Sequence, residues 1–266
     1  MITLRSPREI ARMRRAGLIV WRAHQAVAER VAPGVTTAEL DALVDEVFAR
    51  YQAEPLFKGV PGVTPFPAAT CMSVNEAVVH GIPGPRVLRP GDILSVDTGC
   101  RFEGWCGDSA YTHAVGQIPP RWAELLEVTR GALNLAIELM PKKAWWSEVA
   151  EEMAALVRGH GFSVVDSFSG HGIGKSMHEE PQAPNYNSPS LKRRDIPLKP
   201  GLVLAIEPMV NLGTKEVRCL SDHWTQVTCD GQPSAHFEHT LALTAQGVQV
   251  LTGPPLNDDE AAFCRR

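Results

Sequence analysis

The chain has 266 residues, a formal net charge of −4 and a sequence pI of 6.1. Hydrophobic residues make up 44% of it and charged residues 21%, which is usual for globular proteins and excludes an intrinsically disordered chain. The small negative charge gives no general attraction to nucleic acid or to an anionic membrane, so we expect neither as a partner.

The N-terminal segment, MITLRSPRE, has no basic-then-apolar export signal, and no apolar run is long enough to span a membrane. The six cysteines form no CxxC pair. In a chain without an export signal, we expect free thiols in a reducing compartment. The sequence therefore predicts a cytoplasmic protein.

Two helices are predicted at the start of the chain. Residues 6–9 (SPRE) and 36–39 (TTAE) each begin with a capping residue, and each is followed by apolar residues at helical spacing. A Pro/Gly-rich stretch, residues 55–67, then leads into apolar runs that are typical of strands. These runs cover residues 69–74, 93–100 and 108–115.

The same order of elements returns in the second part of the chain. Pro119-Pro120 opens a predicted helix, and Ser147 is predicted to cap another that ends near Gly159. Asp230-Gly231 is predicted to be the hairpin turn before the last strand. The predicted strands of this part cover residues 163–165, 202–207, 224–228 and 236–243.

A local repeat supports this reading. Residues 90–97 (PGDILSVD) and 200–207 (PGLVLAIE) lie 110 positions apart, and each is a Pro-Gly turn, an apolar strand and a final carboxylate. The order of elements predicts a duplicated helix–helix–sheet unit and an α+β fold, rather than an all-helical or parallel α/β fold. We predict one domain over residues 1–266, with halves at about residues 6–116 and 117–252.

Four acidic residues lie in or at the ends of these apolar strands: Asp97, Asp108, Glu207 and Glu238. Any one of them could be satisfied by an arginine or by backbone amides. If all four converge, they cannot all ionise without raised pKa values or compensating cations. The strand segments 93–100 and 202–207 contain no arginine or lysine. Two divalent cations would balance four carboxylates and a neutral histidine.

Three histidines accompany the acids. His171 stands between glycines in GHGIG, residues 170–174, where the backbone can hold an imidazole at a crowded ion. His178 could reach a substrate amide without binding metal, and His80, at a strand end before a Gly/Pro turn, could project into a cleft. A surface or core imidazole remains the alternative for each. Oxygen ligands with one imidazole suit Mn²⁺, Fe²⁺, Co²⁺ or Zn²⁺ and exclude a thiolate zinc site. A pair of such ions can activate a shared water, which is hydrolysis chemistry.

With these residues identified, the chain resembles type I methionine aminopeptidases from about residue 6 to residue 252. The resemblance implies the pita-bread fold, two pseudo-twofold-related halves around a central antiparallel sheet. It also implies removal of the N-terminal methionine from nascent polypeptides whose second residue is small. The motifs that carry it are SVNEAVVHGIP (73–83), DTG (97–99), GDSA (107–110), GHGIG (170–174), HEEP (178–181), AIEP (205–208) and FEHT (237–240).

The resemblance also implies a role for each metal ligand. Asp97 would bind one of two metal ions, Asp108 and Glu238 would bridge both, and His171 and Glu207 would complete the shell of the second. The ions would be Co, Mn, Fe or Zn. They would also hold the free amine of the substrate, so that cleavage stops after one residue.

The remaining roles follow from the same resemblance. Glu207 would also take the proton from the bridging water, His178 would hydrogen-bond the scissile carbonyl, and His80 would lie near the departing nitrogen. The methionine pocket would be walled by Phe66, Cys71, Met177 and Trp224. Val63 and Met177 stand where aromatic residues are usual in bacterial relatives, so this chain departs from the family's pattern at the pocket.

Asn75 and Ser234 occupy positions where the family sometimes holds a monovalent cation through backbone carbonyls. Only 29 positions separate His178 from Glu207, which leaves no room for the insertion of type II enzymes. We expect a monomer that acts on nascent N-termini, with transient ribosome association. The alternatives are a same-fold Xaa-Pro aminopeptidase, a pita-bread binding protein without catalysis, and a structural protein with paired carboxylates.

Overall fold

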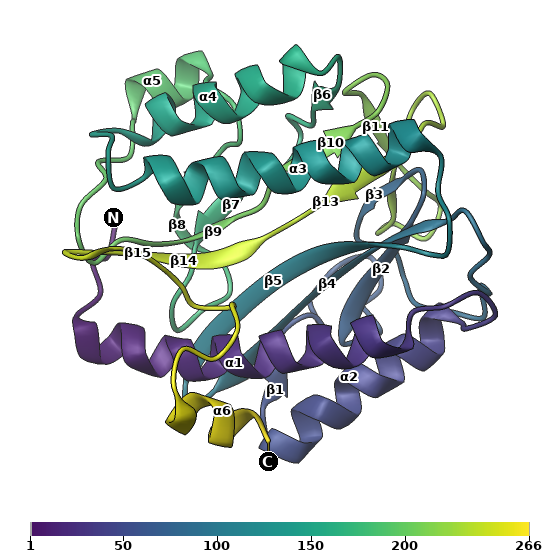
Figure 1. Ribbon diagram of the computed structural model, residues 1–266, viewed down its shortest axis with the longest axis horizontal. Helices are drawn as coiled ribbons and strands as arrows, with labels where there is room; N and C mark the ends of the chain where they lie inside the picture. The colour runs from purple at the N-terminus through teal and green to yellow at the C-terminus, as the bar shows by residue number, and fades with distance from the viewer. Residues whose placement is uncertain (1, 266) are drawn as a thin grey trace.

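Two long helices begin each half of the chain. In the computed structural model, which describes residues 2–265, α1 (Pro7–Arg30) and α2 (Thr37–Tyr51) precede the first strands. α3 (Pro120–Leu139) and α4 (Trp146–Gly159) precede the strands of the second half. The two pairs cover opposite sides of the strands, with α1 and α2 below them and α3 and α4 above in Figure 1. The predicted order of elements, two helices followed by strands in each half, is confirmed.

The helix starts of the first half are those predicted. Ser6 caps α1 and Thr36 caps α2, and in each case the glutamate three residues later bonds back to the backbone of the cap. The predicted cap at Ser147 is wrong. α4 begins at Trp146, and the Ser147 hydroxyl donates to Asp195. Asp195 comes from a distant loop, so local sequence could not reveal this partner.

A four-stranded antiparallel sheet forms the first half. β4 (Ile93–Phe102) is central, with β5 (Trp105–Ala114) along one edge. These two strands pair without interruption from Ile93↔Ala114 to Phe102↔Trp105. The other edge of β4 pairs with the two remaining strands of the sheet, β1 (Glu54–Pro55) and β2 (Thr70–Val74).

The second half contains a five-stranded antiparallel sheet with the strand order β15-β14-β9-β7-β8. Its members are β15 (Gly247–Val250), β14 (His239–Thr244), β9 (Val203–Ile206), β7 (Gly170–Gly172) and β8 (Glu179–Ala183). Two three-stranded sheets accompany it. They contain β13 (Ser234–His236), β10 (Met209–Asn211) and β6 (Ser163–Val164), and β11 (Val217–Cys219), β12 (Gln226–Thr228) and β3 (Ala77–Val79).

The run at residues 236–243, predicted as one strand, is two strands. β9 pairs with β14 and β10 pairs with β13, so the four form one ribbon that is broken at residues 207–208 and 237–238. Pro208 has no N–H to give to the ladder. The N–H of Glu238 instead donates to the Ala110 carbonyl of β5, at 2.9 Å. The break therefore lets the second half bond to the first.

The Asp230-Gly231 turn joins β12 to β13, which pair with other strands, so the predicted hairpin is wrong. The Asp230 carboxylate accepts from the N–H groups of Thr214 and Gln232. The bond from Gln232 is local, and the bond from Thr214 comes from a segment sixteen residues earlier, so the turn is fixed without pairing of its flanking strands. The Asp-Gly dipeptide predicts the turn, but whether its flanking strands pair with each other depends on the tertiary structure.

The repeat is visible in the turns that precede the two carboxylate strands. Gly91 has φ +95° and Gly201 has φ +98°, so both Pro-Gly turns place glycine in the left-handed region. Each half has its own hydrophobic core beneath its helices. The final helix, α6 (Asp258–Cys264), returns to pack on α1, and a short helix, α5 (Pro189–Arg193), precedes β9.

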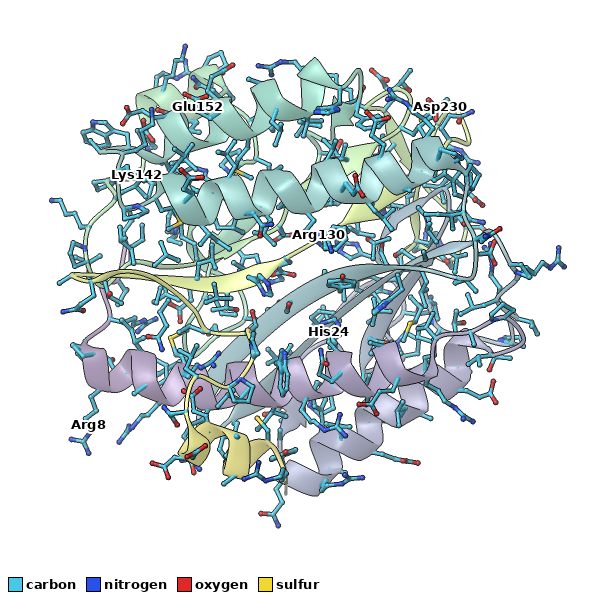
Figure 2. The ribbon with its side chains drawn as sticks, viewed as in Figure 1. Arg8, His24, Arg130, Lys142, Glu152 and Asp230 are labelled. Carbon is cyan, nitrogen blue, oxygen red and sulfur yellow. The ribbon has the colours of Figure 1, made fainter. Side chains whose placement is uncertain are left out.

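Side chains divide by position on the helices. Arg8, Lys142 and Glu152 point away from the molecule, whereas His24 lies between α1 and the strands (Figure 2). The cysteines are free thiols, as predicted. Within residues 2–265, no helix is long and apolar enough to cross a membrane.

Candidate metal centre

Asp97 and Asp108 share one face of the β4–β5 hairpin. Asp97 lies opposite Ala110, and Gly99 lies opposite Asp108. Cross-strand partners point to the same side of a sheet, and so do residues two positions apart, so both carboxylates face the same way. A Cβ atom on Gly99 would lie 2.9 Å from Oδ1 of Asp108. Glycine at this position therefore makes room for the carboxylate.

Glu207 and Glu238 lie at the break in the ribbon of the second half. The backbone bond from Glu238 to Ala110 places Glu238 beside Asp108. Thr240 makes a second connection, because its hydroxyl accepts from the Asp108 N–H at 3.0 Å and donates to the Asp108 carbonyl at 2.8 Å. These bonds bring acids from the two halves into one cluster.

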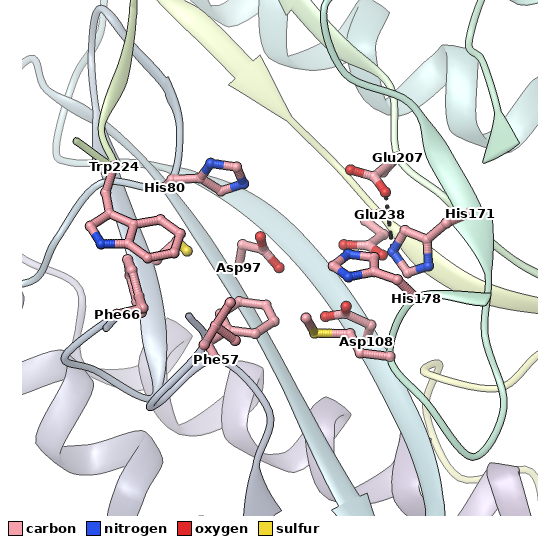
Figure 3. Close-up of a pocket in the computed structure, with 13 residues that line it drawn as sticks. Phe57, Phe66, His80, Asp97, Asp108, His171, His178, Glu207, Trp224 and Glu238 are labelled. Carbon is pink, nitrogen blue, oxygen red and sulfur yellow. Dashed lines mark ion pairs between the residues drawn. The ribbon is translucent and has the colours of Figure 1, made fainter. Parts of the chain in front are cut away.

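His171 completes the cluster from β7. Its Nδ1 donates to the Gly172 carbonyl at 2.9 Å, which leaves the lone pair of Nε2 free to bind a metal. Nε2 lies 3.5 Å from Oε1 of Glu207 (Figure 3). One ligand atom each from Asp108, His171 and Glu238 lie within 4.8 Å of one another.

The flanking glycines of His171 have a packing role. A Cβ atom on Gly170 would lie 2.4 Å from the Ala205 carbonyl oxygen, and one on Gly172 would lie 2.4 Å from that of Glu180. The histidine strand is therefore held tightly between its two neighbours, β9 and β8. This rigidity orients the imidazole.

The electrostatics of the cluster favour bound cations. Burial raises the pKa of Asp108 to about 7. Burial, reinforced by the neighbouring carboxylates, raises the pKa values of Asp97, Glu207 and Glu238 well above their ordinary values. Burial also lowers the pKa of His171 to about 4, so its imidazole is neutral. The set is thus a group of acids that cannot all ionise without positive charge nearby.

The side chains that the structure describes do not supply that positive charge. Within residues 2–265, no ion pair joins these four acids to an arginine or lysine. Buried oxygens of Asp97, Asp108 and Glu238 have no hydrogen-bond partner. Unpartnered carboxylate oxygens beside a free imidazole nitrogen fit divalent metal ions.

His80 and His178 face the same pocket (Figure 3). The ring of His178 lies 4.3 Å from that of His171, centroid to centroid. His80 has φ +59°, an uncommon conformation for a non-glycine residue that is found at functional sites. Burial lowers the pKa of both, that of His80 to about 4 with a contribution from His178. Both are therefore neutral hydrogen-bonding groups at pH 7.

An apolar pocket adjoins the acids. The four residues predicted for it, Phe66, Cys71, Met177 and Trp224, line it together with the metal-site residues. The rings of Phe66 and Trp224 meet edge to face at 5.2 Å. Val63 is 76% exposed and does not line the pocket.

Sequence reasoning missed two lining residues, Phe57 and Val60. They lie in the Pro/Gly-rich stretch, where no periodicity marks which side chains face inward. The only sign of their role in the sequence is that both are apolar residues within a Pro/Gly-rich stretch. At the predicted monovalent site, the Asn75 carbonyl accepts from the Ser234 N–H at 2.9 Å, and the cation stays a prediction.

The comparisons with known proteins agree with this geometry. The sequence matches metallopeptidase family M24 over residues 11–245. It is 44% identical to methionine aminopeptidase 1 of Bacillus subtilis (strain 168) over 252 residues, covering 95% of this chain and 99% of that protein. The crystal structure of methionine aminopeptidase from Thermotoga maritima aligns with a TM-score of 0.90 and 41% identity, covering 96% of this chain and 100% of that one.

A wider likeness concerns the fold. The prolidase from Pyrococcus horikoshii aligns with a TM-score of 0.73 at 20% identity, over 95% of this chain and 64% of that one. The fold and the acid cluster define a metallopeptidase with the pita-bread fold, as predicted. The chain belongs to metallopeptidase family M24 and, within it, to the methionine aminopeptidases.

Proposed function

We propose that the protein removes the N-terminal methionine from polypeptides whose second residue is small. One observation carries the proposal. Four acids and a neutral imidazole, from both halves of the chain, converge beside an apolar pocket, and no arginine or lysine among residues 2–265 pairs with these acids. The hydrolase chemistry rests on the acids, and the preference for methionine rests on the pocket.

Five residues would hold two divalent ions of Co, Mn, Fe or Zn. Asp97 would bind one ion, Asp108 and Glu238 would contact both, and His171 and Glu207 would bind the other. Two ions match the charge of four carboxylates, whereas one would leave the cluster negative. When bound, the ions would make a water nucleophilic at neutral pH and polarise the substrate carbonyl.

The chain's own residues would then handle protons and orientation. Glu207 would accept the proton of the attacking water, because burial raises the pKa of its carboxylate and so makes it a stronger base than an exposed glutamate. His178 would donate a hydrogen bond to the scissile carbonyl. His80 would steady the departing nitrogen. Neutral donors fit these roles, since they stabilise developing negative charge without a fixed positive charge in the ground state.

The apolar pocket would receive the methionine side chain. Phe66 and Trp224 offer ring faces and edges, and Cys71 and Met177 offer polarizable sulfur. Such a lining suits an unbranched thioether. The side chain would be desolvated there while its backbone lies against the acids and histidines.

The setting follows from the same function. We propose that the enzyme works in the cytoplasm as a monomer on nascent chains, with transient contact with the ribosome. A monovalent cation at Asn75 and Ser234 is part of this proposal. It would sit away from the reacting atoms and act on stability.

A panel of peptides tests the function. Protein reconstituted with each of the four metals should release methionine from Met-Ala and Met-Gly peptides but leave Met-Lys and Met-Leu peptides intact. Glu207→Gln protein is the control for contaminating peptidases. Equal cleavage of all four peptides would remove the specificity claim and leave the hydrolase claim. Cleavage of Xaa-Pro peptides alone, or of no peptide with any metal, would contradict the proposal.

A further inference from the structure

His236 is a buried imidazole to which no role has been assigned so far. It ends β13, directly before the break in the ribbon, and only 2% of it is exposed. Its Nε2 atom is buried and has no hydrogen-bond partner. A buried ring nitrogen without a partner is costly, so its surroundings call for an explanation.

The nearest acidic group is the carboxylate of Glu207. Nε2 of His236 lies 3.8 Å from Oε2, and Nε2 of His171 lies 3.5 Å from Oε1 of the same carboxylate. Each oxygen of Glu207 therefore faces its own imidazole. His171 is assigned to a metal ion, so its Nε2 cannot donate a proton. His236 is the imidazole of this pair that remains free to donate.

The backbone of His236 is fixed on both sides. The Thr112 hydroxyl accepts from its N–H at 2.9 Å and donates to its carbonyl at 2.8 Å. The same hydroxyl lies 2.8 Å from the Ser95 hydroxyl of β4. These bonds anchor His236 to the rigid hairpin that also carries Asp97 and Asp108. The imidazole is thus held in place relative to the metal ligands.

We infer that His236 is a positioning residue that donates a hydrogen bond from Nε2 to Oε2 of Glu207 and so directs Oε1 into the metal site. This inference rests on the proposed function, in which Glu207 is both ligand and general base. A distance of 3.8 Å exceeds a hydrogen bond by roughly 1 Å. Catalytic hydrogen bonds are often long in unliganded enzymes and shorten in the working complex.

Two replacements separate donation from packing. His236→Gln keeps an N–H donor, whereas His236→Leu keeps a side chain of comparable bulk without one. We expect His236→Leu to lower kcat on a Met-Ala peptide by ~10–100-fold with little change in KM, as for loss of a group that orients a ligand. His236→Gln should stay close to wild type. His113→Leu is the matched control, since His113 also has a buried Nε2 without a partner.

A second readout does not depend on turnover. Calorimetric titration with Co²⁺ or Mn²⁺ should show the weaker of two binding steps reduced ~10–100-fold in His236→Leu and restored in His236→Gln. In a Glu207→Ala background, His236→Leu should have little further effect on metal affinity, because the acceptor is absent. Thermal unfolding of each variant shows whether it is folded.

The outcomes distinguish this inference from the proposed function. Equal impairment of His236→Leu and His236→Gln, or equal behaviour of both with wild type, would overturn the positioning role. If wild-type protein binds metal but cleaves no Met-Xaa peptide, the proposed function fails. The metal titrations would then still decide whether His236 orients Glu207.

Discussion

Asp97 and Asp108 lie within a hairpin whose residue pairs run unbroken along both strands, whereas Glu207 and Glu238 lie where the ribbon of the second half is interrupted. The hairpin satisfies its inner backbone groups internally and sets the spacing of side chains on one face. The interrupted ribbon releases the Glu238 N–H, which bonds to Ala110 of the hairpin. The hairpin of the first half thus fixes the positions of Asp97 and Asp108, and the interruption in the second half joins Glu238 to this hairpin.

This contrast explains why the metal centre lies at the junction. The outer edge of β5 would otherwise be an open strand edge. Glu238 and Thr240 cover it at Ala110 and Asp108. The bonds that close the edge therefore also bring Asp108 and Glu238 together.

The strongest way to break this arrangement is to neutralise the acid at the interruption. Glu238→Gln should retain the fold but lower kcat/KM on a Met-Ala peptide by at least ~10³-fold. It removes one of four charges that compensate the ions, which supply several kcal/mol of transition-state stabilisation. Bound metal per chain, measured by elemental analysis, should fall as well. Glu216→Gln, at an exposed position, is the control; full metal loading of Glu238→Gln would contradict the bridging role.

A second change tests the uninterrupted hairpin. Gly99→Ala places a methyl group 2.9 Å from Oδ1 of Asp108 and should displace the carboxylate. We expect a loss of ~10²-fold in kcat, the size associated with a misplacement of about 1 Å in an active site. Steady-state assays measure it, with Gly84→Ala as control because a Cβ there meets nothing within 4 Å. Unchanged kcat would show that the hairpin tolerates movement of Asp108.

The connection between the halves can be weakened without touching an acid. Thr240→Val keeps the shape of a side chain that is fully buried but leaves both backbone groups of Asp108 without their partner. The free energy of unfolding should fall by ~1–3 kcal/mol. Denaturant unfolding of metal-free protein measures this. Thr244→Val, near the end of the same strand, should cost much less, and equal losses would argue against a special role for the junction.

The smallest expected effect concerns β5, on the side that faces α1. His24 of α1 approaches β5, with Nε2 2.9 Å from the Ser109 carbonyl, and burial lowers its pKa to about 4 from 6.5. A folded pKa below the unfolded value gives stability that is present above pH 6.5 and is lost as the pH falls towards 4. Relative to His24→Gln, wild type should lose about 1–2 kcal/mol between pH 7 and pH 5.

The measurement is denaturant unfolding of both proteins across this pH range, and the difference between them cancels the titration of the shared acids. His24→Gln keeps a donor for Ser109 but has no proton to gain. Parallel pH curves for the two proteins would show that His24 does not sense pH. A gain in the stability of wild type relative to His24→Gln as the pH falls would reverse the predicted sign and reject the assignment.

Local sequence patterns predicted much of the fold. The capping boxes at Ser6 and Thr36, the paired Pro-Gly turns and the apolar strand runs each depend on neighbours a few residues away, and the structure confirms them. Ser147 and the Asp230-Gly231 turn were misjudged, because their partners, Asp195 and strands of other sheets, are distant in the chain. Features that depend on partners far away in the chain could therefore not be predicted from local sequence.

The candidate site likewise has features that local sequence predicts and features that depend on distant segments. Acids placed in apolar strands and a histidine between glycines marked the ligand set, since such placement is costly unless an ion compensates. The contribution of Phe57 and Val60 to the pocket, and the approach of His236 to Glu207, could not be read from any spacing. Each requires two segments to meet that share no local pattern.

The sequence by itself therefore determined which chemical groups are present and which face of its strand each occupies, because alternation and capping are short-range properties. Only the tertiary structure decided that the ribbon of the second half is interrupted at Pro208 and that the Glu238 N–H bonds to the Ala110 carbonyl. The physical reason is that a freed backbone N–H must find an acceptor, and the choice of acceptor depends on which strand edges meet when the two halves pack together.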